Sequence, residues 1–309
     1  MVVSAVAEPT SDRRGLCDDL VCRSFGLGSI PAQNLDYLLA EEKRPEFLDL
    51  TIIAMEAALL AGDILRAGFG THFQINSKEG HHNLVTEYDH KSEKTIIDFI
   101  RQHVPESQFL AEESGITGSD GDGITWIIDP LDGTVNFAHQ IPIFAVSIAV
   151  EKNGQVIAGV VLQPMTGELF MAEVGKGAFL NGKKIAVTQT QTLSESILAT
   201  GFPYNLAQNP SHCIEHFVDI LKAGIPIRRL GAAAIDLVYT AAGHFDGYFE
   251  VALCPWDCAA GKLILEEAGG KMTTWQGDPF TIRSGHTILA TNGAIHQEAV
   301  TLLSRSAWN

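Results

Sequence analysis

Apolar residues in the first third of the chain recur at helical spacing. One stretch, from residue 47 to 69, presents an apolar face of the width expected for a packed α-helix. A second, with Ile96, Ile97 and Ile100, predicts a helix that ends near His103 and starts after Thr86. The apolar positions of the first stretch are Leu50, Ile53, Ala54, Ala57, Ala58, Ala61, Ile64 and Leu65.

The pattern then changes to that of strands. The short apolar runs at residues 107–114 and 124–129 both lead into acidic residues. Asn153-Gly154 and Asn181-Gly182 each stand between two apolar runs, which is the signature of a tight β-hairpin. An antiparallel sheet is therefore expected over roughly residues 141–187.

Strands and helices alternate after the polar stretch 188–196, as in layered folds. A subdomain boundary near residue 190 divides the chain into a poorly ordered extension (1–45), an α+β subdomain with the large antiparallel sheet (46–190) and an α/β subdomain (191–309). The elements expected in the last part are strands near 197 and at 225–230, 246–253 and 287–292, a hairpin around 275–278, and helices at 214–222, 232–243, 256–270 and from 294.

Composition indicates a globular protein of one large or two smaller domains. The 309 residues are 46% hydrophobic and 19% charged. The 21 Lys and Arg residues against 37 Asp and Glu residues give a net charge of −16, which argues against nucleic acid or an anionic membrane as a direct partner. An anionic substrate stays possible because bound cations can invert the local field. No apolar run reaches the roughly 18 residues of a membrane span.

The five cysteines form no CxxC pair, so a zinc site or disulfide framework is not expected. Reduced thiols indicate a cytoplasmic protein. Residues 1–45 lack clear periodicity. Arg13 and Arg14 are typical of an organelle transit peptide, whereas Asp18 and Asp19 oppose one, so organelle targeting stays open.

The stretch "WIIDPLDGTVNF" (126–137) carries the strongest chemical signal. Asp129 and Asp132 follow a buried strand, and Pro130 stiffens the turn between them. Two adjacent carboxylates either share a proton or hold a hard cation, and oxygen-only ligands suit Mg²⁺. If a helix begins at Gly133-Thr134, its free N–H groups favour phosphate. The alternative is a purely structural role, in which an aspartate caps a helix after a turn. The full "DPLDGT" motif after a buried strand favours the metal and phosphate interpretation over this one.

Other acids stand at comparable positions. Glu112 and Glu113 end a strand, Asp257 lies between a strand and a helix, and Asp89 lies in "VTEYDH". Because strand ends at one edge of a sheet meet in space, we expect these acids to converge on Asp129.

These motifs resemble those of the inositol monophosphatase family. "WIIDPLDGTVNFAH" and "WDCAAGKLILEEAGG" resemble its two signatures, "LAEES" and "LVTEYD" two further blocks, all in family order from about Pro45 to the C-terminus. The resemblance implies an α+β fold, a layered αβαβα sandwich of the inositol monophosphatase and fructose-1,6-bisphosphatase type. It also implies a Mg²⁺-dependent, lithium-sensitive phosphatase that is commonly a homodimer.

The resemblance further implies roles for individual residues. Thr134 and Asp89 would orient the attacking water beside Glu112. The implied metal ligands are Glu112, Asp129, the Leu131 carbonyl, Asp132 and Asp257. The implied substrate-binding residues are Lys78, Asp132, Gly133, Thr134, Gly231, Ala232, Ala233, Glu250 and Asp257. Ala232 stands where some members carry a hydroxyl, so one polyol contact would be missing.

Three functions follow as alternatives. The first is hydrolysis of inositol 1-phosphate, which Glu250 favours because a carboxylate accepts bonds from neighbouring hydroxyls. The second is a related activity on fructose 1,6-bisphosphate, histidinol phosphate or a 3′-phosphoadenosine nucleotide, for which Arg228 and Arg229 are candidate ligands. The third is a regulatory protein-binding role with secondary phosphatase activity. In the first two the partner is a small phosphorylated polyol, sugar or nucleotide.

Overall fold

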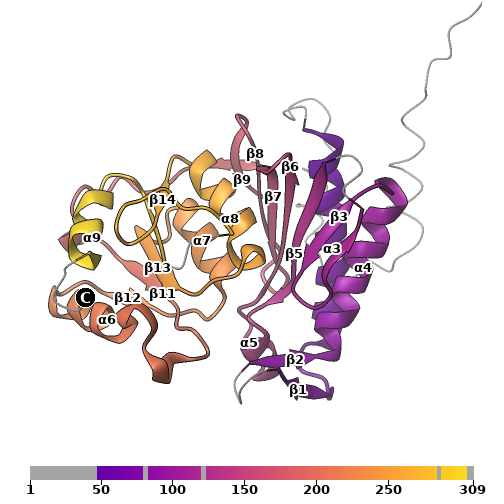
Figure 1. Cartoon of the computed structure of the whole chain (residues 1–309), viewed down its shortest axis with the longest axis horizontal. Coiled ribbons are helices and arrows are strands. Elements are labelled where there is room, and N and C mark those ends of the chain that lie inside the picture. Colours follow the sequence, from indigo (N-terminus) through magenta and orange to yellow (C-terminus); the bar gives the residue numbers. More distant parts are fainter. Residues whose placement is uncertain (1–46, 79–82, 120–122, 284–286, 305–309) are drawn as a thin grey trace, which may run out of the picture.

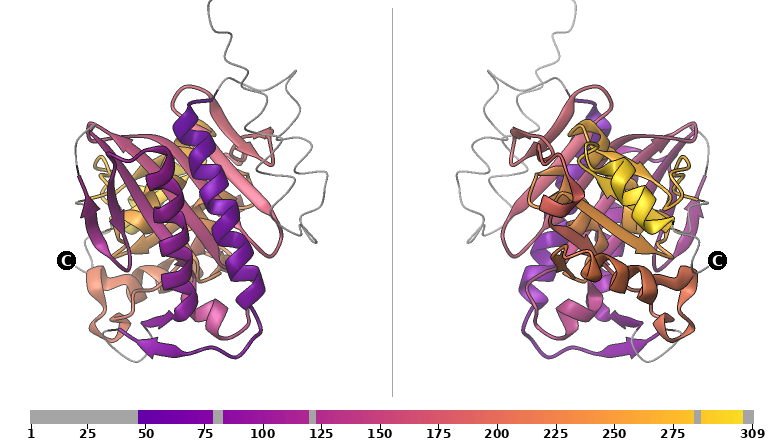
Figure 2. Two further views of the ribbon diagram at one scale, coloured as in Figure 1. Left: turned by 90° about the vertical axis from the view of Figure 1, so that its right-hand side faces the viewer. Right: turned by 90° about the vertical axis from the view of Figure 1, so that its left-hand side faces the viewer.

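The computed structural model describes residues 47–78, 83–119, 123–283 and 287–304. They form an α+β sandwich of five layers (Figure 1). Helices α3 and α4 cover one face of an eight-stranded sheet, and α7 and α8 lie between that sheet and a five-stranded one. Helices α6 and α9 lie on the opposite side of the molecule from α3 and α4 (Figure 2). The layered fold expected from the family resemblance is confirmed.

The helices agree closely with the periodicity of the sequence. The helix α4 begins behind Thr86, whose hydroxyl accepts from the Tyr88 N–H while Asp89 accepts from the Thr86 N–H, a capping box. The helices are α3 Asp49–Gly68, α4 Glu87–His103, α5 Thr134–Ala138, α6 Cys213–Lys222, α7 Ala233–Ala241, α8 Pro255–Glu267 and α9 His296–Leu303.

The strands form three sheets. The eight-stranded sheet has the order β10-β9-β8-β7-β6-β5-β3-β4, and all its pairs are antiparallel except β3 with β5. The five-stranded sheet, β12-β11-β13-β15-β14, is mixed, because β11 runs parallel to both of its neighbours. The strands β1 and β2 pair alone. Their bounds are β1 Ile75–Ser77, β2 Leu84–Thr86, β3 Gln108–Ala111, β4 Gly115–Gly118, β5 Ile124–Asp132, β6 Ala145–Lys152, β7 Gln155–Gln163, β8 Glu168–Glu173, β9 Gly177–Leu180, β10 Lys183–Ile185, β11 Leu198–Thr200, β12 Ile227–Arg228, β13 Gly247–Val251, β14 Lys271–Thr273 and β15 Thr287–Thr291.

Some details differ from the sequence expectations. The predicted strand 225–230 is only the two-residue β12, and β4 was not predicted, since its exposed Ile116 lies among glycines and polar residues. The hairpin expected around 275–278 is a turn closed by one bridge, Thr273 to Pro279, and β14 pairs instead with β15. The extension 1–45 lies outside the described residues, and the boundary near residue 190 stays a prediction.

The two faces of the large sheet each pack against helices through a separate cluster of buried apolar side chains. One cluster packs α3 and α4 against the large sheet around Trp126 and Ile100, and another packs α7 and α8 between the sheets around Ile127 and Tyr248. The alternating side chains of β5 thus serve two cores, which is why its run is apolar throughout. No helix of the described part of the chain is long and apolar enough to cross a membrane.

The central helix α8 lies unusually close to the large sheet. A Cβ atom at Gly159 in β7 would lie 2.9 Å from the Ala260 carbonyl oxygen and 3.0 Å from its Cα. The absent side chain therefore sets the distance between α8 and the sheet.

We predict that Gly159→Ala lowers the free energy of unfolding by about 1–3 kcal/mol, because backbone of α8 would have to move to accept the methyl group. Gln155→Ala, at an exposed position of the same strand, is the control and should change it by less than about 0.5 kcal/mol. Urea denaturation of both variants measures the difference. Equal stabilities would contradict the close approach.

Candidate active site

The acidic motif lies at the end of β5, next to a break in the sheet register. The pairing of β5 with β6 shifts between Asp129 and Asp132. In a regular strand residues three apart point to opposite faces, and the irregularity removes this constraint. The Pro130 carbonyl accepts a 2.7 Å bond from the Ser92 hydroxyl of α4, which fixes the turn. Both carboxylates are almost fully buried, at 2% and 8% exposure.

Asp132 is held by the start of α7. Its two carboxylate oxygens accept from the N–H groups of Ala233 (3.2 Å) and Ala234 (2.7 Å). These are first-turn N–H groups without partners inside the helix, so the carboxylate satisfies them. Burial nevertheless raises the pKa of Asp132 to about 7, against the lowering effect of these bonds. The contact brings Ala233, predicted to face the substrate, to the metal-site motif.

Thr134 and Asp89, to which the resemblance assigned one shared role, are hydrogen-bonded to each other. Gly133 has φ = +90°, and α5 starts directly after it, at Thr134. The Thr134 hydroxyl lies 2.9 Å from both Asp89 Oδ1 and the Leu131 carbonyl oxygen. Asp89 Oδ2 accepts from the Thr86 N–H (2.8 Å) and hydroxyl (2.6 Å), and burial raises the Asp89 pKa to about 6. The capping box of α4 thus fixes the carboxylate that positions Thr134.

Glu112, the residue that follows β3, lies next to the end of β5 that carries Asp129. Its N–H donates to the Ile128 carbonyl of β5 (3.1 Å), so its side chain starts beside Asp129. The Lys78 ammonium bridges Glu112 (2.8 Å) and Glu113 (2.6 Å). Burial raises the pKa of Glu112 although Lys78 lowers it. Glu113 had no assigned role in the sequence, and only the tertiary structure gives it Lys78 as a partner.

Asp257 completes the acidic group from the first turn of α8. Its Oδ2 accepts a 2.6 Å bond from the Cys254 N–H. Desolvation by the surrounding protein, followed by repulsion from Asp132, raises its pKa well above the usual range. The pKa of Asp129 is raised in the same way by burial and then by Glu112, Asp132 and Asp257.

The electrostatics of this group favour a bound cation. Burial raises the pKa values of these carboxylates most, and repulsion adds to it: Glu112 raises the pKa values of Asp129, Asp132 and Asp257, and Asp132 raises those of Asp129 and Asp257. Oxygen donors of this kind suit a hard divalent ion. Among the described residues, no three His, Cys, Asp or Glu side chains are placed so that they could hold an ion as they stand. The oxygen donor chemistry fits a hard metal ion, but the described side chains as placed do not form a ligand set, which stays a prediction.

The other predicted substrate residues lie on the C-terminal side. A Cβ at Gly133 would lie 3.2 Å from the Ala232 Cβ, so the two segments touch. Glu250 in β13 lies directly against the Gly201 backbone and accepts a bond from the Tyr248 hydroxyl. Burial raises the Glu250 pKa to about 7, and the charge of Arg229 lowers it. Gly231, with φ = +85°, lies beside Asn136 and Arg229.

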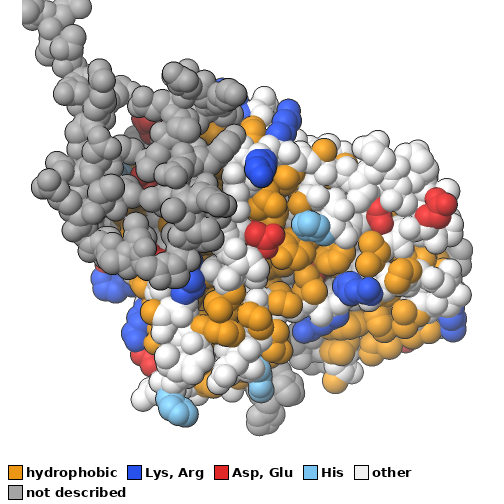
Figure 3. All heavy atoms as spheres, turned by 180° about the vertical axis from the view of Figure 1, so that it is seen from behind, with side chains coloured by type: hydrophobic (Ala, Val, Ile, Leu, Met, Phe, Trp, Pro, Cys, Tyr) orange, Lys and Arg blue, Asp and Glu red, His pale blue; other side chains and the backbone are white. Residues whose placement is uncertain are grey.

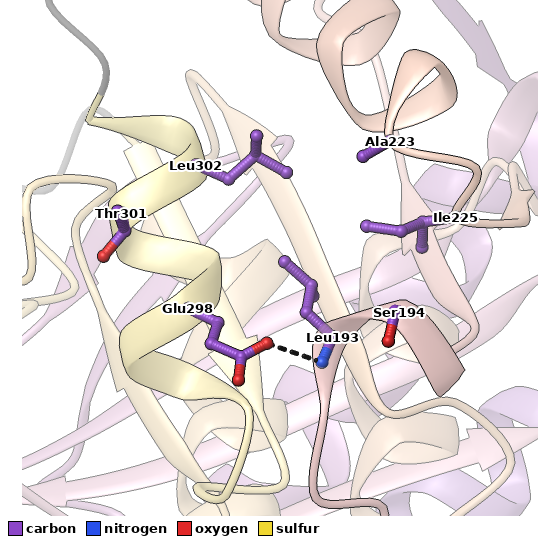
Figure 4. A pocket seen from close by; sticks show the side chains of 7 residues that line it. All are labelled: Leu193, Ser194, Ala223, Ile225, Glu298, Thr301 and Leu302. Carbon is purple, nitrogen blue, oxygen red and sulfur yellow. Dashed lines mark hydrogen bonds between the residues drawn. The ribbon is translucent and has the colours of Figure 1, made fainter.

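A separate cavity contains none of these residues. It has a volume of about 320 Å³ and lies between α9, the 3₁₀ turn Leu193–Glu195 and the end of α6 (Figure 4). Glu298 Oε2 accepts from the Leu193 N–H (2.8 Å) at its edge. Its lining is Leu193, Ser194, Ala223, Ile225, Glu298, Thr301 and Leu302, which carries no convergent chemistry.

Comparisons with known proteins agree on one family. A model of the inositol monophosphatase family matches residues 48–307. An inositol-1-monophosphatase of Synechocystis is 42% identical, covering 80% of this chain and 85% of the relative. The Nus factor SuhB of Escherichia coli is 41% identical, covering 79% and 89%.

Solved structures give the same result. The extragenic suppressor protein suhB of Bartonella henselae superposes with a TM-score of 0.79 at 37% identity, covering 84% of this chain and all of that one. The inositol monophosphatase of Anabaena superposes with a TM-score of 0.72 at 39% identity, covering 84% and 98%.

We predict that Gly133→Ala lowers the free energy of unfolding more than Gly175→Ala does. Both glycines have positive φ, which disfavours alanine by about 1–2 kcal/mol. At Gly133 the new Cβ also meets the Ile143 carbonyl oxygen at 3.1 Å, whereas nothing lies within 4 Å at Gly175. Chemical denaturation should show that the Gly133→Ala variant loses about 1 kcal/mol or more of unfolding free energy beyond the loss in Gly175→Ala. Equal losses of unfolding free energy in the two variants would mean that the turn at Gly133 is not tightly enclosed.

Proposed function

The chain belongs to the inositol monophosphatase family, and we propose that it hydrolyses inositol 1-phosphate to inositol and inorganic phosphate with Mg²⁺ as its cofactor. The observation that supports this most directly is the bond between Thr134 and Asp89 near the buried Asp129, whose pKa is raised by burial and further by the charges of Glu112, Asp132 and Asp257. A polarised hydroxyl next to a cation-binding group is what metal-assisted hydrolysis of a phosphate ester requires.

The proposed metal ligands are Glu112, Asp129, the Leu131 carbonyl, Asp132 and Asp257. When bound, the cation would neutralise the phosphate, lower the pKa of a water molecule and stabilise the leaving oxygen. Asp132 fits this role because its oxygens are already aimed by the α7 N–H groups and keep further lone pairs. Lys78 lies against Glu112 and so is placed to meet the phosphate at the same edge.

The protein's own groups position the reactants. Asp89 Oδ1 accepts a hydrogen bond from the Thr134 hydroxyl, so the lone pairs of that hydroxyl can orient a water molecule, with Glu112 beside it. The water oxygen attacks phosphorus and gives up a proton, the ester oxygen leaves with the bonding electron pair, and the proton given up by the water balances the one that this oxygen takes up to become the alcohol. Gly133 lets the backbone approach the phosphate closely, because any side chain there would collide with Ile143 and Ala232.

The alcohol part of the substrate would face Gly231, Ala232, Ala233 and Glu250. A buried carboxylate such as Glu250 binds neighbouring hydroxyls of a polyol well. We also propose a homodimer in the cytoplasm that is inhibited by lithium. Apolar side chains grouped on the rear face (Figure 3), and Ile214, Val218 and Leu221 exposed along one side of α6, support self-association.

A second candidate function is protein binding, because relatives at 41% identity are named Nus factor SuhB. Such a role would not need turnover. Asp129→Asn separates the two roles. If this variant loses phosphatase activity but still replaces the wild-type protein in the cell, protein binding is the primary role.

We predict that phosphate release with Mg²⁺ is faster from inositol 1-phosphate than from fructose 1,6-bisphosphate, histidinol phosphate or 3′-phosphoadenosine 5′-phosphate, and is reduced by Li⁺. Asp129→Asn removes a ligand charge and should lower turnover at least about a hundredfold. Asp98→Asn, an exposed acid of α4, is the control and should leave it unchanged. Fast turnover on the nucleotide alone would exclude the inositol phosphatase.

We predict that Thr134→Val lowers kcat by about 10²–10⁴-fold with little change in KM, because the side chain keeps its size and loses the oriented hydroxyl. Thr134→Ser retains the hydroxyl and should recover most of the activity. Steady-state kinetics at saturating Mg²⁺ separate kcat from KM. A serine variant as inactive as the valine variant would show that the methyl group, not the hydroxyl, matters.

A further inference from the structure

The side chain of Asn136 connects the phosphate side of the proposed site to its alcohol side. Asn136 lies in α5, two residues after Thr134, and is 5% exposed. Its Nδ2 atom donates to the carbonyl oxygens of Ile143 (2.7 Å) and Leu230 (2.9 Å) and lies 3.4 Å from that of Gly231. An amide nitrogen carries two hydrogens, and the two shorter bonds use both of them. The proposed mechanism gives this side chain no role.

The backbone that Asn136 holds forms the wall of the turn at Gly133. A Cβ atom at Gly133 would lie 3.1 Å from the Ile143 carbonyl oxygen and 3.2 Å from the Ala232 Cβ. Asn136 bonds to that same carbonyl and also to the segment 230–232, which lies 94 residues further along the chain. The segment proposed to face the alcohol is therefore fastened to the turn proposed to bind the phosphate.

The phosphate side of this connection has supports of its own. Phe137, the next residue of α5, is fully buried. Its ring lies in an aromatic group, with centroid distances of 5.1 to 5.9 Å to Phe69, Phe73, Tyr88 and Phe144. Thr134 is bonded to Asp89 of α4. Because these contacts do not involve the Asn136 amide, its removal would leave α5 in place and release the segment 230–232.

The alcohol side is held by a second contact of a different kind. The N–H groups of Ala233 and Ala234 donate to Asp132, which is also a proposed metal ligand. A carboxylate that binds a cation shares its lone pairs between the cation and these donors. The uncharged amide of Asn136 donates to backbone carbonyls, so its hold on the preceding residues does not depend on the charge of the acidic group.

We propose that Asn136 is a positioning residue that fixes the segment 230–232 against the turn at Gly133 and so sets the distance between the bound phosphate and the alcohol of the substrate. The inference rests on the proposed function and adds a residue that acts through the backbone it holds. Without its two donors the carbonyls of Ile143 and Leu230 lose these partners, and the segment moves away from the turn.

The test compares kcat/KM for inositol 1-phosphate with that for 4-nitrophenyl phosphate, whose alcohol carries no further hydroxyl, in Asn136→Ala at saturating Mg²⁺. We expect the ratio to fall about tenfold through a higher KM for inositol 1-phosphate, which is the scale of one hydrogen bond to a charged group such as Glu250. A loss of folded protein alone would reduce both activities equally and leave the ratio unchanged.

Asn292→Ala is the matched control. Asn292 is also buried, and its Nδ2 donates to the Thr188 hydroxyl and the Thr190 carbonyl, both at 2.9 Å. This variant loses the same kind of cross-link at a place that contributes no residue to the proposed site, so it should leave the ratio unchanged. An equal fall of the ratio in Asn292→Ala would overturn the proposal.

Hydrogen–deuterium exchange measures the positioning without turnover. In Asn136→Ala the amides of residues 230–236 should exchange about tenfold faster, while those of residues 126–135 stay as in the wild-type protein. If the wild-type protein does not hydrolyse inositol 1-phosphate, the proposed function fails, and the exchange still decides whether Asn136 holds the segment. Asn136→Asp keeps the size of the side chain and removes both donors, and it replaces the alanine variant if that one does not fold. An unchanged ratio of kcat/KM values, or unchanged exchange in residues 230–236, would overturn the proposal.

Discussion

Mutual repulsion between carboxylates at the end of β5 is the constraint on which the rest of the site depends. Burial raises the pKa values of Asp129, Asp132 and Asp257, and the charges of neighbouring carboxylates, Glu112 among them, raise these values further. Backbone donors oppose that repulsion: α7 donates to Asp132, Cys254 to Asp257 and Leu131 to Asp129. Folding thus builds a group that favours a cation, and helix starts supply the positive potential that holds it together.

The layered sandwich explains how these donors reach one point. The helices α7 and α8 fill the space between the two sheets, and both begin near the end of β5, while α4 begins there from the opposite layer (Figure 1). Each helix contributes an acid or an N–H group from its first turn. Glycine at 159 and 133 allows the backbone contacts that this convergence requires. The layered fold therefore brings segments that are distant in the sequence together at the site.

Charge balance also shapes the alcohol end of the site. The region proposed to hold the alcohol contains the buried carboxylate of Glu250, whose pKa is raised by burial and lowered by the charge of Arg229. In the proposed function the acidic group would hold the metal and the phosphate, and Glu250 would accept bonds from the alcohol that carries the phosphate. The two ends are joined through Asp132, which contacts α7.

The sequence by itself determined the helices α3, α4 and α8, the hairpins of the large sheet and the acids of the site, because periodicity, turn residues and strand-end motifs are local signals. It missed β4 and overextended β12, since short exposed strands depend on their neighbours for pairing. Only the tertiary structure decided that Lys78 bridges Glu112 and Glu113, that α7 holds Asp132, and that Asp236 Oδ1 is buried without a hydrogen-bond partner among the described residues. These contacts join residues distant along the chain, and the packing of layers, not any local pattern, sets the distance between their charges.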